Sequence, residues 1–556
     1  MMHSAASKTA VAGRELRRGV GSMTARAMSG VPSWATLDPD SLSGSKPCKL
    51  ENLVDGSWKG TNEYMNVPDP MNGEDFIQMP ATKGSELDEF KNSLRKVPKS
   101  GVHNPLKNPD RYNMWGEISF KAARALHDPE VEDFFIKCIQ RTMPKHRAQA
   151  LAEVHVSRTF LKNFSGDGVR FMARGFTVSG DHNGQESRGY RWPYGPVAII
   201  APFNFPLEIP VLQLMGALYM GNKPVIKGSP QTSMVLEQYV RLLIDCGMPP
   251  EALDLLHADG PETQEVVTDT PVRMTQFTGS SGVATRLLQA TTGKVKVEDA
   301  GFDWKVVGPD VKDKKDIEYV AWQCDQDAYA ISGQKCSAQS MLFCHENAAE
   351  AGLFDQMAKL AERRNLEDLS IGPVMSWSTQ RIMEHKERVL SIPGAKVLFG
   401  GEELENHTIY EKYGAVQPTA IFVPLDSMLS SEENFEIAST ELFGPFQIVT
   451  TYSDKDVDRI LEACERVPHH LTAAVVSNDP AFQHKMLANT VNGTTYHGIR
   501  ARTTGAPANH WFGPAGNPNG AGIGTPEAIR LVWSCHREII QDNLIPSDWN
   551  TPSEAT

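Results

Sequence analysis

The chain has 556 residues, of which 40% are apolar and 22% charged, and its formal net charge is −13. This length exceeds what one hydrophobic core usually organises, so we expect two or more subdomains. The acidic balance argues against a protein that binds nucleic acid or anionic membranes, and no apolar run predicts a membrane span. The eight cysteines include no C-x-x-C pair, which favours free thiols and argues against a structural metal.

The N-terminus differs in composition from the rest of the chain. Residues 1–30 carry five basic side chains against one acid: Lys8, Arg14, Arg17, Arg18 and Arg26 against Glu15. Basic, acid-poor segments that are rich in Ser, Ala and Thr are typical of mitochondrial transit peptides. We therefore predict that residues 1–40 form a targeting segment and that the protein works in the mitochondrial matrix. A disordered tail is the alternative.

Residues 45–174 predict a scaffold of short strands and long helices. A hairpin is expected over residues 53–58, because Asp55-Gly56 favours a two-residue turn. Residues 67–73 are rich in Pro, Asp, Asn and Gly and predict a loop. Apolar residues then recur at helical spacing in four stretches, which predict helices over residues 85–96, 112–126, 129–141 and 145–161.

Two separate segments predict a β-structured arm. Residues 175–193 are polar and alternating, as expected for a two-stranded hairpin. Residues 529–540 form an apolar run that we expect to be extended, and it would be exposed unless another surface covers it. A contact between subunits is the natural cover, so we expect a homo-oligomer built from dimers.

Three strand–loop–helix units follow the arm. Strands are predicted over residues 196–201, 224–227 and 272–277. Asn204 follows the first strand, Lys227 ends the second, and Gly279-Ser280 follows the third. Open α/β sheets bind ligands at the carboxyl ends of their strands, and a helix that begins after a glycine can receive a phosphate. The alternatives are an ordinary helix cap at Asn204, a solvated Lys227 and a commonplace turn glycine. A fourth strand over residues 294–298 ends in the acidic pair Glu298-Asp299.

The stretch Gly333-Gln334-Lys335-Cys336-Ser337-Ala338 places a cysteine among small residues. The Gly-Gln-x-Cys-x-Ala pattern resembles the active-site loop of the NAD(P)-dependent aldehyde dehydrogenase superfamily. Gln-Lys-Cys-Ser-Ala resembles its Δ1-pyrroline-5-carboxylate (glutamate γ-semialdehyde) dehydrogenase branch. An aldehyde carbon must become tetrahedral before hydride can leave it, and a thiolate is the side chain best suited to form that adduct. A buried structural cysteine is the alternative.

Beyond this loop the α/β alternation continues. We predict helices over residues 346–363 and 378–392, and strands over residues 397–399 and 418–423. The run from Thr440 to Pro445 resembles the Glu-x-Phe-Gly-Pro box of the superfamily. Residues 494–524 are rich in Gly, Pro and Asn and predict an anchoring loop that binds through its backbone, with a flexible linker as the alternative.

The resemblance covers the chain from about Ser45 onward and implies an α/β, aldehyde dehydrogenase-like fold. It implies a Rossmann-like nucleotide domain from residues 45–174 and 194–300 and an α/β catalytic domain from residues 301–525. A small β oligomerisation arm would comprise residues 175–193 and 526–556, and in the superfamily such an arm pairs with the end of the chain to build the dimer.

The resemblance also implies the catalytic roles. Cys336 would be the nucleophile, and the side-chain amide of Asn204 would bind the oxyanion. Glu298 would be the general base that activates water to release the acid. Asp299 is the alternative base, since Asp-Ala-Gly follows Glu298 here where the family usually has Leu-Gly-Gly.

NAD is the cofactor that the resemblance implies. Lys227 would bind the adenosine ribose, and Gly279 and Ser280 would receive the pyrophosphate. Glu441 would bind the nicotinamide ribose, with the ring of Phe443 near the nicotinamide. Pro230 stands where the family often has a glutamate that also binds the ribose, which leaves NADP open as an alternative.

For the substrate, the resemblance implies an aldehyde with a carboxylate that neutral donors hold. Those donors would be the Ser337 hydroxyl and the backbone N–H groups of Gly520, Ala521 and Gly522. Another aldehyde dehydrogenase, acting on succinic or methylmalonic semialdehyde, is one alternative. A catalytically silent protein on the same fold is the other.

Overall fold

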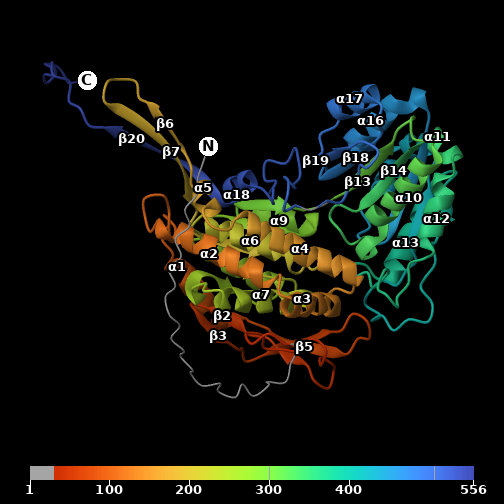
Figure 1. Ribbon diagram of the computed structural model, residues 1–556, viewed down its shortest axis with the longest axis horizontal. Helices are drawn as coiled ribbons and strands as arrows, with labels where there is room; N and C mark the ends of the chain where they lie inside the picture. Colours follow the sequence, from red (N-terminus) through yellow and green to blue (C-terminus); the bar gives the residue numbers. More distant parts are fainter. Residues whose placement is uncertain (1–30, 300, 506, 556) are drawn as a thin grey trace, which may run out of the picture.

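The computed structural model describes residues 31–299, 301–505 and 507–555, so most of the predicted targeting segment lies outside the described residues. Two α/β halves lie side by side, and a thin β arm projects from the first half (Figure 1). Each half is built on its own seven-stranded sheet. No helix among the described residues has the length and apolar character needed to cross a bilayer.

The first sheet carries the three predicted strand–loop–helix units. Its order is β12-β11-β8-β9-β10-β2-β3. The strands are β12 (Val295–Glu298), β11 (Thr275–Thr278), β8 (Pro196–Ile200), β9 (Lys223–Lys227), β10 (Asp254–Leu255), β2 (Asn52–Val54) and β3 (Ser57–Lys59). The strands from β12 to β10 are parallel, so their carboxyl ends meet at one edge. The predicted hairpin is confirmed: β2 and β3 pair antiparallel around Asp55 and Gly56, both with positive φ.

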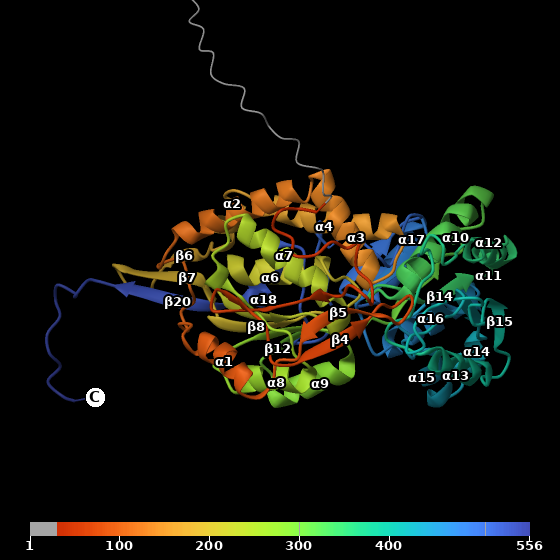
Figure 2. The same cartoon turned by 90° about the horizontal axis from the view of Figure 1, so that it is seen from below.

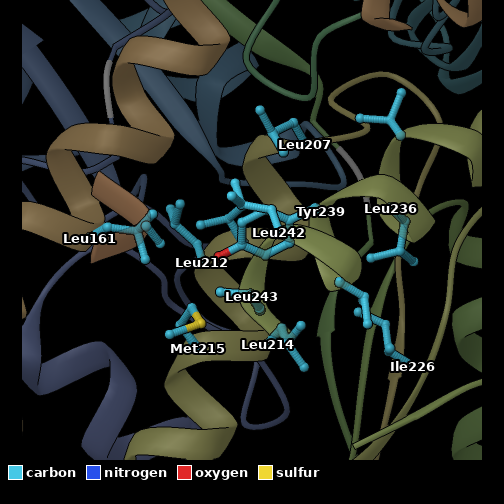
Figure 3. Packing of buried hydrophobic residues seen from close by; sticks show 14 of the residues in the cluster. Leu161, Leu207, Leu212, Leu214, Met215, Ile226, Leu236, Tyr239, Leu242 and Leu243 are labelled. Carbon is cyan, nitrogen blue, oxygen red and sulfur yellow. The ribbon is translucent and has the colours of Figure 1, made fainter. Parts of the chain in front are cut away.

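Helices cover both faces of this sheet. They are α1 (Leu87–Arg95), α2 (Asp110–Ala125), α3 (Pro129–Thr142), α4 (Arg147–Asn163), α5 (Gly168–Met172), α6 (Glu208–Tyr219), α7 (Ser233–Asp245), α8 (Gly260–Thr268) and α9 (Ser281–Ala290). The four predicted helices of the scaffold correspond to α1 to α4, within two residues at each end. Every residue of α6 is buried, because α6 is covered on all sides. Figure 3 shows Leu212 and Met215 of α6 beside Leu242 and Leu243 of α7 in this core.

Two parts of the N-terminal region differ from the prediction. Residues 31–40 pack on the first half: Trp34 stacks on Phe135 at 5.8 Å between ring centroids, and Leu37 is 8% exposed. The predicted targeting segment therefore extends too far into the folded region. A three-stranded sheet of β1 (Cys48–Lys49), β5 (Asp75–Pro80) and β4 (Tyr64–Pro68) includes the first two residues of the predicted loop 67–73.

The second half is built on the sheet β15-β16-β17-β14-β13-β18-β19. The strands are β13 (Asp303–Val307), β14 (Gln339–His345), β15 (Lys396–Phe399), β16 (Thr419–Phe422), β17 (Phe446–Tyr452), β18 (Thr472–Val476) and β19 (Thr494–His497). Its helices are α10 (Lys314–Tyr329), α11 (Glu346–Glu350), α12 (Leu353–Ala361), α13 (Thr379–Leu390), α14 (Leu425–Leu429), α15 (Glu432–Ala438), α16 (Val457–Arg466) and α17 (Pro480–Ala488). The single helix predicted over residues 346–363 is divided into α11 and α12 at Gly352, whose φ is 90°.

The arm contains β6 (Phe176–Ser179), β7 (Gln185–Pro193) and β20 (Ser534–Asp542). β20 pairs antiparallel with β7 of the same chain along its full length, and the arm extends away from both halves (Figure 2). The extended run predicted over residues 529–540 is wrong in its first part, because α18 (Pro526–Trp533) precedes β20. Thr525 accepts a hydrogen bond from the Ala528 N–H and Pro526 is the first helical residue, which together start this helix.

Candidate active site

Two cavities meet at Cys336 and Glu298, at the junction of the two halves. The larger has a volume of about 1080 Å³ and the smaller about 440 Å³, and these two residues line both of them. The large cavity opens along the carboxyl ends of the first sheet, and α4, α6 and α10 contribute to the wall of the small cavity. A reaction centre at Cys336 can therefore receive one ligand from each side.

The loop before Cys336 has an unusual backbone. Ile331, Ser332 and Gly333 all have positive φ, between 52° and 67°. Such a conformation is strained for Ile and Ser and persists only when neighbours hold it. The buried side chain of Gln334 does this by accepting the Met375 N–H at 2.7 Å and donating to the Pro373 carbonyl at 2.9 Å. The loop thus presents Cys336, which is only partly buried, to both cavities.

Asn204 is docked against this loop. Its side-chain amide donates to the backbone carbonyl of Gln334 at 3.2 Å, and the residue is 3% exposed. The capping alternative does not apply, because α6 begins four residues later and Leu207 is its N-cap. The amide of Asn204 therefore lies on the large-cavity wall that also contains Cys336.

Glu298 ends β12 and is 3% exposed. Burial raises its pKa to about 7, although the neighbouring Cys336 thiol lowers it as a hydrogen-bond donor. Its Oε1 has no hydrogen-bond partner among the described residues. Burial, followed by the charge of Glu298, raises the pKa of the Cys336 thiol well above its usual range. Asp299 lines only the large cavity, so geometry favours Glu298 as the base.

The predicted cofactor residues line the large cavity together. Lys227 ends β9, and burial lowers its pKa to about 8. Gly279 and Ser280 precede α9, with Ser280 as its N-cap. Burial raises the pKa of Glu441 to about 8, against the effect of a hydrogen bond from the Gly301 backbone. Phe443 packs edge-on against Phe203 at 6.0 Å between ring centroids.

Sequence reasoning missed other residues of the large cavity, among them Arg286 and Arg381. Arg286 lies on α9, five residues after its first residue, and Arg381 lies on α13. Neither belongs to a motif, so only the fold shows that they reach this cavity.

The structure does not place the predicted anchoring loop 520–522 at either cavity. None of its residues lines either cavity, and two of its three backbone N–H groups are already used: Gly520 N–H donates to the Asn517 carbonyl and Ala521 N–H donates to the Val297 carbonyl, both at 2.8 Å. The Val297 N–H donates in turn to the Asn519 carbonyl at 2.8 Å. This segment therefore extends the first sheet beside β12 and fixes the strand that carries Glu298.

Another part of the Gly-rich segment reaches the small cavity beside Ser337. Ser337 is 4% exposed, and its hydroxyl donates to Thr504 Oγ1 at 3.3 Å. Thr504 donates to the Ser337 carbonyl at 3.2 Å, so the two segments hold each other. Gly505, Arg500 and Arg502 line the same cavity. Thr504 and Gly505 belong to the same Gly-rich segment as residues 520–522 and precede them by about sixteen residues.

A buried ion pair contacts the loop that contains Thr504 through a backbone hydrogen bond. Asp327 Oδ2 accepts the Thr503 N–H at 2.9 Å and pairs with Lys305 Nζ at 2.8 Å. Both charged side chains are almost fully buried. Within the described residues, no group of three His, Cys, Asp or Glu side chains is arranged to hold a metal.

Comparisons with known proteins give the same picture. The sequence model of the aldehyde dehydrogenase family matches residues 58–518. The chain is 55% identical over 520 residues to mitochondrial Δ1-pyrroline-5-carboxylate dehydrogenase 12A1 of Arabidopsis thaliana, with 93% of each chain covered. It is 30% identical over 311 residues to 1-pyrroline-5-carboxylate dehydrogenase of Anoxybacillus flavithermus, covering 53% of this chain and 56% of the relative. A crystal structure of an NAD-dependent aldehyde dehydrogenase from Sinorhizobium meliloti shares the fold, with a TM-score of 0.76, 20% identity, and 92% and 98% of the two chains covered.

Proposed function

Because this chain belongs to the aldehyde dehydrogenase family, we propose that it oxidises L-glutamate γ-semialdehyde to L-glutamate with NAD. The substrate is the open-chain form of Δ1-pyrroline-5-carboxylate, and the reaction belongs to proline catabolism. The observation that carries this function is the 55% identity, over 93% of both chains, to the Arabidopsis thaliana enzyme that bears the name of this substrate.

The first chemical step joins the substrate to Cys336. A buried thiol with a raised pKa needs a neighbouring base, and Glu298, with a pKa near 7, is in position to take its proton. The thiolate then attacks the aldehyde carbon to form a thiohemiacetal. The side-chain amide of Asn204 and the backbone N–H groups of the loop stabilise the oxyanion, an effect often worth about 3 kcal/mol.

The residues of the large cavity fit a dinucleotide. The cavity is large enough, and Lys227 makes no hydrogen bond to another described side chain. A Cβ on Gly279 would approach the tip of the Phe277 ring to 2.6 Å, so this ring would have to move to admit a larger residue. The N-terminus of α9 offers unpaired N–H groups to a pyrophosphate. Lys227 would hold the adenosine ribose, and Glu441 and Phe443 would hold the nicotinamide end. When bound, NAD supplies the hydride acceptor that converts the thiohemiacetal into a thioester.

Release of glutamate requires water. Glu298 lines both cavities and, once it has released the Cys336 proton to solvent, is again a base near neutral pH, so it deprotonates the water that attacks the thioester. The Cys336 thiolate is the leaving group, and it takes this second proton from Glu298, which returns the enzyme to its starting state. The strand segment 519–521 keeps Glu298 in place through its hydrogen bonds to Val297.

The substrate carboxylate would bind in the small cavity. Ser337 and Thr504 have hydroxyls there that would exchange their present hydrogen bonds for hydrogen bonds to the carboxylate. Gly505 gives close access to the backbone, and Arg500 and Arg502 make the wall electropositive. Hydrogen bonds to a charged group are worth about 1.5–3 kcal/mol each. Three carbons separate the aldehyde carbon, which Cys336 would attack, from the carboxylate carbon, which this cavity would hold.

Replacement of Ser337 by alanine should weaken binding of the carboxylate. We expect KM for glutamate semialdehyde to rise by the equivalent of about 1.5–3 kcal/mol, while oxidation of propanal changes little because propanal has no carboxylate. Steady-state kinetics with both aldehydes make the comparison. Equal impairment with both would mean that Ser337 maintains the shape of the loop.

A panel of aldehydes tests the function itself. NADH formation with glutamate semialdehyde should exceed that with succinic semialdehyde, methylmalonic semialdehyde and propanal in kcat/KM. A higher kcat/KM with either of the other semialdehydes would assign the enzyme to a different branch of the family. The absence of turnover with every aldehyde would favour the catalytically silent alternative.

The arm supports a proposal that the enzyme is a homo-oligomer built from dimers. The arm leaves large apolar side chains exposed, among them Phe176 and Val178 of β6 and Ile540 of β20, which are each more than half exposed. A projecting sheet with an open edge is a ready surface for pairing with another chain. A dimer that places these side chains at the subunit contact would cover them.

The Arabidopsis thaliana relative is named as a mitochondrial enzyme, and the basic, acid-poor N-terminus of this chain is consistent with import into the matrix. A reporter fused to residues 1–40 should enter the matrix. Replacement of Arg14, Arg17, Arg18 and Arg26 by glutamine should leave the reporter in the cytosol, because import depends on positive charge. Fluorescence microscopy with a matrix marker checks this, and equal import of both fusions would contradict it.

A further inference from the structure

A buried carboxylate on the wall of the small cavity has no part in the chemistry above. Glu208 is the first residue of α6, is 7% exposed, and lines the small cavity together with Cys336 and Ser337. Its backbone N–H donates to Glu153, but no hydrogen bond or ion pair joins its carboxylate to another described residue. Buried ionisable groups are normally paired, because an unpaired charge in a dry site is costly.

The two charged side chains beside Glu208 pair with each other. Lys145 Nζ pairs with Glu153 Oε2 at 2.9 Å and donates to the Asn204 carbonyl at 2.8 Å, and both side chains are fully buried. The other oxygen of Glu153 accepts the N–H groups of Leu207 and Glu208. Lys145 and Glu153 therefore neutralise each other, and Glu208, when ionised, adds one negative charge that this cluster does not balance.

The basic side chains of the small cavity do not pair with Glu208. Lys335 donates to the Gln326 carbonyl at 2.7 Å, and Arg502 lies over the ring of Tyr496 at 4.9 Å. Arg500 and Arg502 also line this cavity, and among the described residues neither forms an ion pair with the carboxylate of Glu208. The cavity thus has a basic region near Thr504 and an unpaired acid on the α6 side.

Glu208 is also close to the reacting atoms. The charge of Glu208 is one of the causes that raise the pKa of the Cys336 thiol. The pKa of Glu208 is itself raised, first by burial and then by the charge of Glu153, while Lys145 lowers it. The charge of Glu298 raises the pKa of Glu208 further. A cation bound beside Glu208 would offset the burial of its carboxylate, and it would relieve the repulsion that opposes formation of the thiolate.

We propose that Glu208 accepts the α-ammonium group of the substrate and is the residue that selects an α-amino acid aldehyde over an aldehyde with only a carboxylate. The inference rests on the proposed function, since the ammonium lies on the carbon next to the carboxylate that Ser337 and Thr504 would hold. In the cyclic form of the substrate the nitrogen belongs to a ring imine. An acceptor for ammonium therefore also favours the open-chain form, which is the form that has an aldehyde.

A pair of substrates isolates this contact. Glutarate semialdehyde has the same chain length and terminal carboxylate as glutamate semialdehyde but has no amino group. In the full-length protein, Glu208→Gln should lower kcat/KM for glutamate semialdehyde by about 10- to 100-fold, mainly through KM, and should leave glutarate semialdehyde unchanged or improved. Glu208→Asp keeps the charge and should retain an intermediate preference. Glu318→Gln, which removes an exposed charge from α10, should behave as the unaltered protein.

The outcomes separate this inference from the proposed function. Unaltered protein that does not oxidise glutamate semialdehyde would overturn the proposed function. If it does oxidise glutamate semialdehyde, equal losses with both substrates in Glu208→Gln, or no loss with either, would overturn the role of Glu208. The melting temperature of each variant is measured alongside. If Glu208→Gln does not fold, the ratio of the two kcat/KM values in Glu208→Asp decides, and an unchanged ratio would overturn the role.

Discussion

Replacement of Cys336 by alanine should abolish NADH formation, with a loss of at least ~10⁴-fold, and should leave NAD affinity almost unchanged. Cys336 is the only described cysteine that lines both cavities, and no hydroxyl in the site can replace its thiolate. The residues proposed to bind NAD belong to other elements of the fold. Stopped-flow absorbance for NADH and fluorescence titration with NAD measure the two properties separately.

The matched control for this variant is Cys535→Ala. Cys535 is partly buried in β20 of the arm, far along the chain from the active-site loop, and its thiol donates to the Trp192 carbonyl. This variant should keep full activity. Turnover in Cys336→Ala at a rate near that of the unaltered protein would end the assignment of Cys336 as the nucleophile.

Replacement of Glu298 by glutamine should separate the two halves of the reaction. Hydride transfer needs the thiohemiacetal, but release of glutamate needs an activated water. We therefore expect a burst of about one NADH per active site, which forms more slowly because glutamine cannot take the Cys336 proton, followed by turnover that is slower by about 10²–10⁴-fold. Pre-steady-state absorbance resolves the burst from the slow phase.

The pH dependence provides a second test of Glu298. A base acts in its ionised form, and burial places the pKa of Glu298 at about 7. The rate of thioester hydrolysis should therefore rise as the pH increases through about 7 and level off above it, and the residual rate of Glu298→Gln should lose this step. Asp299 lies next to Glu298 but lines only the large cavity, so Asp299→Asn should retain both the rate and the pH step. A stall in Asp299→Asn with near-normal turnover in Glu298→Gln would move the base by one residue.

Local patterns were sufficient for many elements of the fold. The Asp55-Gly56 turn, the helices α1 to α4 and the strands β8 and β9 have clear signals in adjacent residues, and the structure has them close to the predicted positions. The error at residues 529–533 arose because a local helix signal competed with an apolar run. Residues 529–533 look like a strand by composition, but the Thr525-Pro526 start signal and burial of Trp533 in the first core make them helical.

The site shows the same limit. Cys336, Asn204 and Glu441 belong to motifs, so sequence could propose them as a group. The choice between loops within residues 494–524 could not be made in this way, because glycines in the segment serve different purposes. Gly520 and Ala521 complete a sheet edge, while Gly505 borders the small cavity. Glu208 has no motif, and its importance appears only when the pairing of its neighbours Lys145 and Glu153 is known.

The most direct test of the account is to trap the covalent intermediate. Glu298→Gln is mixed with glutamate semialdehyde and NAD, quenched in acid so that the amino group stays protonated, digested, and analysed by mass spectrometry. The account predicts a glutamyl group on the peptide that contains Cys336, in an amount equal to the NADH burst, and no such group when NAD is omitted. A burst of NADH with the acyl group on another cysteine, or with no acyl group on the protein, would contradict a mechanism in which the two cavities meet at Cys336.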